Sequence, residues 1–198
     1  METKPARVRI LDAAHELMLT VGLARATTKE IARTAGCSEA ALYKYFAGKE
    51  ELFIQVLAER LPRLTPLLDS LTADPGRATV EENLTEVARH ATRFYEQSFP
   101  MAASLYAETQ LKRRHDDAMR RLDRGPHKPI EGLDAYLRAE QAAGRVRADA
   151  DTFAAASLLL GACAQWAFAY AATPDGTRPP ADEFAARLAR TLLAGLTP

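Results

Sequence analysis

Residues 27–46 read TTKEIARTAGCSEAALYKYF, and this stretch decides the fold of the chain. Thr27 and Glu30 have the spacing of a capping box, in which each residue satisfies a free backbone N–H at the start of a helix. Gly36 suits the left-handed position that ends a helix, and Ser38 is a favourable N-cap for the next one. The stretch therefore predicts two short helices joined by a tight turn.

The second of these helices has an apolar side and a polar side. Ala41, Leu42 and then Tyr45 or Phe46 recur at spacings of three and four residues, which predicts one buried face. The other side presents a set of polar and small side chains: Glu39, Ala40, Tyr43 and Lys44. Two helices joined by a short turn with a glycine are typical of a helix-turn-helix that presents its second helix to DNA. From this spacing alone, an ordinary helical hairpin is the alternative.

The neighbouring residues favour the first interpretation. Residues 42–52, LYKYFAGKEEL, closely resemble the L-Y-x-[HY]-F-x-x-K-[ED]-x-L run of the tetracycline-repressor (TetR) family of bacterial regulators. Residues 27–38 match the family pattern T-T-x-x-[IL]-A-x-x-A-G-[VC]-S, and the preceding helix, residues 10–22, matches as well. The resemblance covers residues 7–56 without a gap. Beyond them only the size and an all-helical plan agree.

This resemblance implies a fold and a function. The fold is all-α, with an N-terminal three-helix helix-turn-helix head at residues 1–50 and a larger helical body for ligand binding and dimerisation at residues 51–198. The implied function is a ligand-releasable repressor that binds a palindromic operator in double-stranded DNA as a homodimer. The alternative is a helical small-molecule-binding or adaptor protein whose helix-turn-helix no longer recognises DNA.

Several residues of the head are expected to contact the DNA backbone. Tyr43 and Lys49 match family positions that grip the backbone, where a phenol can donate to a phosphate oxygen and an ammonium adds a point charge. Thr28 and Ser38 lie at helix N-termini, where backbone N–H groups can bind phosphate. Tyr45 fits a further backbone contact, and its alternative is a core aromatic.

Three other residues are candidates for reading bases. Lys29 can donate to guanine O6 and N7, Glu39 can accept from cytosine N4, and Ala40 can contact a thymine methyl group. Lys44 adds a positive charge to the same side. An acidic residue in the first turn also stabilises the helix dipole, so a purely structural role for Glu39 stays open.

The rest of the chain shows helical periodicity and no strand pattern. The expected helices cover residues 49–61, 79–98, 129–143 and 149–172, with a new element starting at Pro100 and a last helix opening at Pro180. Pro62 and Pro66 are expected to interrupt the chain between the first two of these helices. The apolar helix from Asp149 and the last helix are candidates for a four-helix dimer interface.

Large side chains of the body are candidates for lining an effector pocket, with plain core packing as the alternative. They are Phe94, Tyr95, Phe99, Met101, Tyr106, Met119, Trp166 and Tyr170.

Charge neither requires nor excludes DNA binding. The formal net charge is zero, while residues 1–49 contain eight Lys/Arg and five Asp/Glu. The basic residues around 112–114 and 120–124 are a rival nucleic-acid site. Asp116 and Asp117 lie four residues from basic residues on either side, which indicates a solvated helix instead.

Other functional classes find little support in the chain. Cys37 and Cys163 are expected to be reduced core thiols of a cytoplasmic protein, with a redox switch as the alternative. The four histidines have no ligand spacing, so we expect no metal and no cofactor. No nucleophile elbow or pair of carboxylates indicates an enzyme. We find no signal peptide and no apolar run of transmembrane length, and therefore expect no membrane association.

Overall fold

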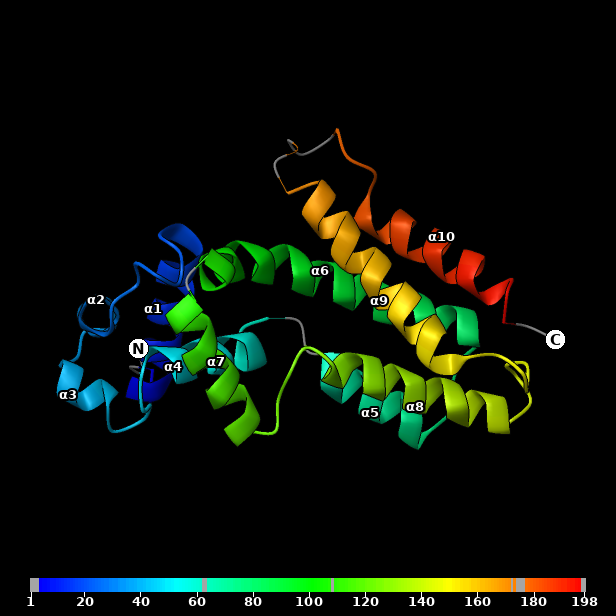
Figure 1. Cartoon of the computed structure of the whole chain (residues 1–198), viewed down its shortest axis with the longest axis horizontal. Helices are drawn as coiled ribbons and strands as arrows, with labels where there is room; N and C mark the ends of the chain where they lie inside the picture. The colour runs from blue at the N-terminus through cyan, green and yellow to red at the C-terminus, as the bar shows by residue number, and fades with distance from the viewer. Residues whose placement is uncertain (1–3, 62–63, 108, 172, 174–176, 197–198) are drawn as a thin grey trace. The chain divides into compact units, whose positions relative to one another are not determined.

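The computed structural model describes residues 4–61, 64–107, 109–171, 173 and 177–196. Within these residues the regular secondary structure is entirely helical, which confirms the expected all-α class (Figure 1). The helices are α1 (Ala6–Thr20), α2 (Thr28–Thr34), α3 (Glu39–Leu42), α4 (Lys49–Glu59), α5 (Leu64–Ala73), α6 (Val80–Ala107), α7 (Thr109–Arg121), α8 (Lys128–Ala142), α9 (Thr152–Ala169) and α10 (Ala181–Leu193).

The chain forms two compact units. The first unit is Met1–Leu61 with Gln97–Gly125, and the second is Pro62–Glu96 with Pro126–Pro198. The long helix α6 contributes to both units. The expected functional division at residue 50 stays a prediction.

In the first unit, α1 packs against α2 and α4, α2 against α3, and α4 against α7. The local signals in the sequence are confirmed. Both hydrogen bonds of the capping box between Thr27 and Glu30 are present, and the Ser38 side chain accepts from the backbone N–H of Ala41. Gly36 has φ of +65°, the left-handed conformation that turns the chain from α2 into α3. These contacts define the helix-turn-helix.

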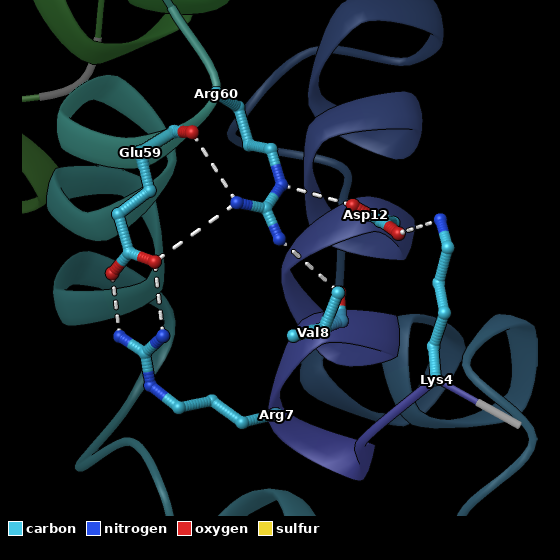
Figure 2. Close-up of polar contacts among 6 residues, drawn as sticks. All are labelled: Lys4, Arg7, Val8, Asp12, Glu59 and Arg60. Carbon is cyan, nitrogen blue, oxygen red and sulfur yellow. Dashed lines mark hydrogen bonds and ion pairs between the residues drawn. The ribbon is translucent and has the colours of Figure 1, made fainter. Parts of the chain in front are cut away.

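Arginine side chains tie α1 to α4, as Figure 2 shows. Arg60 donates from Nε to Asp12 Oδ1 at 2.9 Å and from Nη2 to the carbonyl of Val8 at 3.4 Å. Arg7 of α1 donates to both carboxylate oxygens of Glu59, at 2.9 and 2.5 Å. The hydrogen bond from Lys4, together with Arg60, lowers the pKa of Asp12 below its ordinary value. This α1–α4 clamp holds the helices on which the helix-turn-helix packs.

In the second unit, α8 packs against both α5 and α9, and α9 also packs against α10. The core contains Leu68 of α5, Leu84 of α6, Tyr136 of α8 and Leu159 of α9. A Cβ atom at Gly132 would lie 3.2 Å from Leu68 Cδ1, so glycine permits the close approach of α5 and α8. Tyr136 is completely buried, and its hydroxyl accepts a hydrogen bond from Asn83 Nδ2 at 3.0 Å.

The structure corrects two expectations about prolines. Pro100 does not start a new element but lies inside α6, which is continuous from Val80 to Ala107. A proline removes one backbone hydrogen bond, and the flanking residues keep the helical conformation because packing outweighs that local preference. Pro66 lies in the first turn of α5, where the missing N–H is not needed, so it does not interrupt the chain there. The interruption expected at Pro62 lies outside the described residues.

Helix α9 corrects a third expectation. Residues Thr152–Ala169 are long and apolar enough to cross a membrane by length and composition alone, although we expected no such run. In this structure 44 % of the segment is buried, including Leu159, Leu160 and Cys163. The core helix of a globular protein passes the same test, so this finding is weak evidence for a membrane span.

Candidate nucleic-acid interface

The α2–turn–α3 segment buries one side and exposes the other. Ile31, Ala32, Ala35, Leu42 and Phe46 are all buried, and they anchor the segment to the core of the first unit. Because these apolar residues share one side, the candidate DNA-contacting residues are left on the outside. The candidate DNA-contacting residues that are exposed are Lys29, Ser38, Ala40, Tyr43, Lys44 and Tyr45.

The two tyrosines are both surface residues. Tyr43 is 52 % exposed and Tyr45 is 46 % exposed. The alternative of Tyr45 as a core aromatic is therefore wrong, because the neighbouring Phe46 takes the core position with 2 % exposure. Each phenol can donate a hydrogen bond outward.

Glu39 is held by α2, which the sequence did not indicate. The Thr28 hydroxyl donates to Glu39 Oε1 at 2.5 Å, and the same hydroxyl oxygen lies 3.4 Å from the Tyr43 hydroxyl. The carboxylate therefore links the first residue of α2 to the first residue of α3. With its hydroxyl proton in this bond, Thr28 has its backbone N–H left to offer a phosphate.

Lys49 has a structural contact as well as a charge. Its ammonium donates to the carbonyl of Ala24 at 3.0 Å, which ties the start of α4 to the loop after α1. An ammonium has three donors, so this bond leaves others for a phosphate. Lys49 also lines an open hollow of about 430 Å³ together with a set of residues from α4 and α7: Glu50, Thr109, Gln110, Leu111 and Arg114.

Four exposed cations of the head have no ion pair with any other residue that the structure describes. They are Arg25, Lys29, Arg33 and Lys44, and all four are exposed. Our sequence reasoning omitted Arg25 and Arg33. Arg33 has an acid three residues before it, but that Glu30 carboxylate accepts from the backbone N–H of Thr27 at 3.2 Å and from its hydroxyl at 2.8 Å. A search for basic residues whose neighbouring acids already serve a helix cap would have found it.

The candidate effector-pocket residues fall in both compact units. In the second unit, Trp166 is 5 % exposed, and its ring centroid lies 5.3 Å from that of Tyr170. Phe94 and Tyr95 meet edge to face at 5.4 Å and pack on the core.

The other four candidates belong to the first unit. Phe99 and Met119 are half-buried, and Tyr106 is 71 % exposed. The side chain of Met101 lies outside the described part of the structure. A pocket lined by these eight residues stays a prediction.

The other residues with possible chemistry are the two cysteines and the potential metal ligands. Cys163 is buried, and burial raises the pKa of its thiol to about 11. Cys37 is half-buried in the turn after α2. No group of three or more His, Cys, Asp or Glu with metal-binding geometry occurs among the residues the structure covers.

Comparisons with known proteins agree on one family. Residues 10–56 match the family model described as "Bacterial regulatory proteins, tetR family". Residues 82–194 match "AefR-like transcriptional repressor, C-terminal domain".

Curated relatives match part of the chain. The chain is 46 % identical to the uncharacterized HTH-type transcriptional regulator TtgW of Pseudomonas putida over 59 residues, which are 30 % of this chain and 44 % of TtgW. It is 32 % identical to the HTH-type transcriptional regulator BetI of Rhizobium meliloti over 107 residues, 52 % of each chain. The matches thus span about half of these relatives or less.

Solved structures resemble the whole chain. A putative TetR-family regulator from Mesorhizobium loti superposes with a TM-score of 0.74 and 22 % identity over 100 % of both chains. The transcriptional regulator FadR from Bacillus subtilis, in complex with stearoyl-CoA, gives a TM-score of 0.69 and 17 % identity over 96 % of this chain and 98 % of FadR. At this identity the likeness shows a shared fold.

Proposed function

The chain belongs to the TetR family of bacterial regulatory proteins, and we propose that it is a homodimeric repressor whose DNA binding is released by a small effector. Family membership makes it a helix-turn-helix transcription regulator and not an enzyme. The observation that supports the finer proposal is the outer side of α2 and α3, where exposed donors and unpaired cations stand on a buried apolar base. We place its action in the cytoplasm, where the chromosome is accessible.

The outer side of this helix pair offers two kinds of DNA contact. Lys29 and Ala40 are exposed at the first turns of α2 and α3, where they would face base edges in the major groove. Tyr43, Tyr45 and Lys44 follow on the same segment and would contact the backbone, as would the N-terminus of α3 at Ser38. Glu39 is occupied by Thr28, so we assign it an orienting role first and cytosine contact second.

A single head offers few phosphate contacts, so tight and specific binding requires two half-sites. Helix-turn-helix dimers read half-sites about 34–36 Å apart. The outer side of α9 supports a second copy as the partner, since Leu158 is 65 % exposed and Phe168 is 69 % exposed. With Ala154 and Gly161, these residues form an exposed apolar stripe at helical spacing, next to α10. A second copy of the same stripe would cover it.

Release by an effector would act through a shift of populations. In one arrangement the two heads match the half-sites, and in another they do not. A compound that binds better to the second arrangement lowers the affinity for the operator. Related proteins make such regulation plausible: FadR was crystallised with stearoyl-CoA, and SmeT of Stenotrophomonas maltophilia is the repressor of a multidrug efflux pump.

The proposal is tested by a mobility shift with the protein's own upstream region, with a shuffled duplex of equal length as control. We expect a specific complex whose affinity falls as salt rises, together with a dimer by light scattering. A monomer without salt-dependent duplex affinity would refute the repressor and favour the adaptor function instead.

A further inference from the structure

Trp166 lies at the centre of an aromatic cluster in the second unit. Phe184 of α10 stacks on it, with ring centroids 5.6 Å apart and planes inclined by 23°. Tyr170, the residue that follows α9, contacts it with a centroid distance of 5.3 Å. The indole is 5 % exposed, and its Nε1 is buried without a hydrogen-bond acceptor in the described part of the chain.

An arginine side chain lies over this cluster. The guanidinium carbon of Arg178 is 5.3 Å from the centre of the Trp166 ring. Nη1 of the same guanidinium donates to Glu96 Oε1 at 2.7 Å. Arg178 thus makes a cation–π contact with Trp166 and a hydrogen bond to the Glu96 carboxylate at the same time. An aromatic face attracts a cation through its quadrupole, and a nearby carboxylate adds a charged hydrogen-bond acceptor.

We propose that Trp166 and Glu96 form an effector site for a planar organic cation, which the guanidinium of Arg178 fills when no effector is bound. This inference rests on the proposed effector-responsive function and names the chemical class of the effector. The side chain of Arg178 is 30 % exposed, so it has a route to water when an incoming amidinium or guanidinium takes its place. An effector that carries a hydrogen-bond acceptor beside its cation would also satisfy the indole N–H.

The position of Glu96 gives a reason why this exchange matters. Glu96 is the last residue of α6 within the second unit, and α6 continues into the first unit from Gln97. Pro100, four residues later, has no N–H to donate to the Glu96 carbonyl, so the helix lacks one backbone bond at this place. Binding at the Glu96 carboxylate therefore acts next to the turn of α6 in which Pro100 removes a backbone hydrogen bond.

Three probes of similar shape and different charge test the site: benzamidinium, benzamide and benzoate. Trp166 is the single tryptophan of the chain, so its fluorescence reports binding at this place. In the wild-type protein we expect benzamidinium to bind at least tenfold more tightly than benzamide, and benzoate to bind least. Arg178→Ala should increase the affinity for benzamidinium about tenfold, because the internal competitor is removed. Glu96→Gln should decrease it about tenfold.

Arg138→Ala is the matched control, since Arg138 lies on α8, its side chain is exposed, and it pairs with a carboxylate, that of Asp134. It should leave all three affinities unchanged. Equal binding of benzamidinium and benzamide in the wild type, or an unchanged benzamidinium affinity in Glu96→Gln, would overturn the cation site. If Arg178→Ala does not fold by circular dichroism, the wild-type charge ranking and Glu96→Gln still decide.

A parallel mobility shift without any probe separates this inference from the function on which it rests. Specific DNA binding without preference for benzamidinium refutes the cation site alone. A preference for benzamidinium without DNA binding supports the site and refutes the proposed repressor.

Discussion

Two basic surfaces of the first unit differ in what their cations contact. On α7, Lys112 pairs with Asp116 at 2.6 Å, Arg114 lies 3.6 Å from Glu50, and Arg120 pairs with Asp117. On α2 and the segment after α3, Lys29, Arg33 and Lys44 have no ion pair among the described residues. On α7, Arg113 and Arg121 are also exposed without an ion pair among the described residues, so that surface has both paired and unpaired cations, whereas every cation named on the second surface is unpaired. The fraction of cations without an ion pair, more than their number, distinguishes the α2–α3 surface from the α7 surface.

The largest expected effect comes from removing the three unpaired cations together. The triple variant Lys29→Ala, Arg33→Ala, Lys44→Ala should bind its operator at least about 100-fold more weakly and with a shallower salt dependence. The reason is that each lost phosphate contact reduces the number of counterions released when the protein binds DNA. Fluorescence anisotropy at two salt concentrations measures both quantities.

The matched control removes three paired cations from α7. Lys112→Ala, Arg114→Ala, Arg120→Ala changes the charge by the same amount and should alter affinity by less than about threefold, since screened surface pairs contribute little at a distance. An equal loss in both triple variants would show that net charge, not availability, governs binding.

Within the α2–α3 surface, single variants should separate backbone contacts from base contacts. Tyr43→Phe keeps the ring and removes the hydroxyl, so it should weaken binding to all operator variants alike, by about threefold to tenfold. Lys29→Ala should cost about 1–3 kcal/mol on the best sequence and relax the preference at one base pair. Binding to a panel of single-base operator variants measures the difference. If Lys29→Ala weakens binding to all operator variants equally, Lys29 contacts the DNA backbone and not a base.

The contrast between local and long-range bonds shows how far the sequence could predict the site. The capping box at Thr27 and the glycine turn at Gly36 depend on bonds within a few residues, and both were predicted. The bond from Thr28 to Glu39 spans 11 residues, and the contact of Arg178 with Glu96 spans 82. Such bonds depend on how helices pack, and periodicity does not report packing. Pro100 was misread for a related reason, because tertiary contacts outweigh the local preference of a proline.

A paired arginine of the first unit, Arg60, should affect stability more than DNA affinity. Arg60→Ala removes the hydrogen bonds to Asp12 and to the Val8 carbonyl, and should lower the free energy of unfolding by about 1–2 kcal/mol. Lys4→Ala, which removes the exposed pair with Asp12, should cost less than about 0.5 kcal/mol. Urea unfolding measures both. A larger loss for Lys4→Ala would contradict the role assigned to the clamp.

The clamp also predicts a pH dependence. Because the pKa of Asp12 is lowered in the folded protein, its contribution is present above the ordinary carboxyl value of about 4 and is lost as pH falls through the lowered pKa. Asp12 is 38 % exposed, so solvent screening keeps this contribution below about 1 kcal/mol. Asp12→Asn should make unfolding stability less dependent on pH in that acidic range. An unchanged pH profile would show that the pair contributes nothing in solution.

The smallest expected effect concerns Glu39, whose carboxylate accepts from Thr28 and so joins α3 to α2. Glu39→Gln keeps an oxygen that accepts from Thr28 and removes the negative charge, so binding to non-specific duplex should strengthen by about twofold to threefold at low salt. Glu16→Gln on α1 is the control for the same charge change at an exposed position. If Glu39→Gln instead weakens binding tenfold only at operators with one particular cytosine, the carboxylate reads that base. The Thr28 bond would then hold a specificity residue in place for the cytosine, and an acid among cations would be part of the recognition surface.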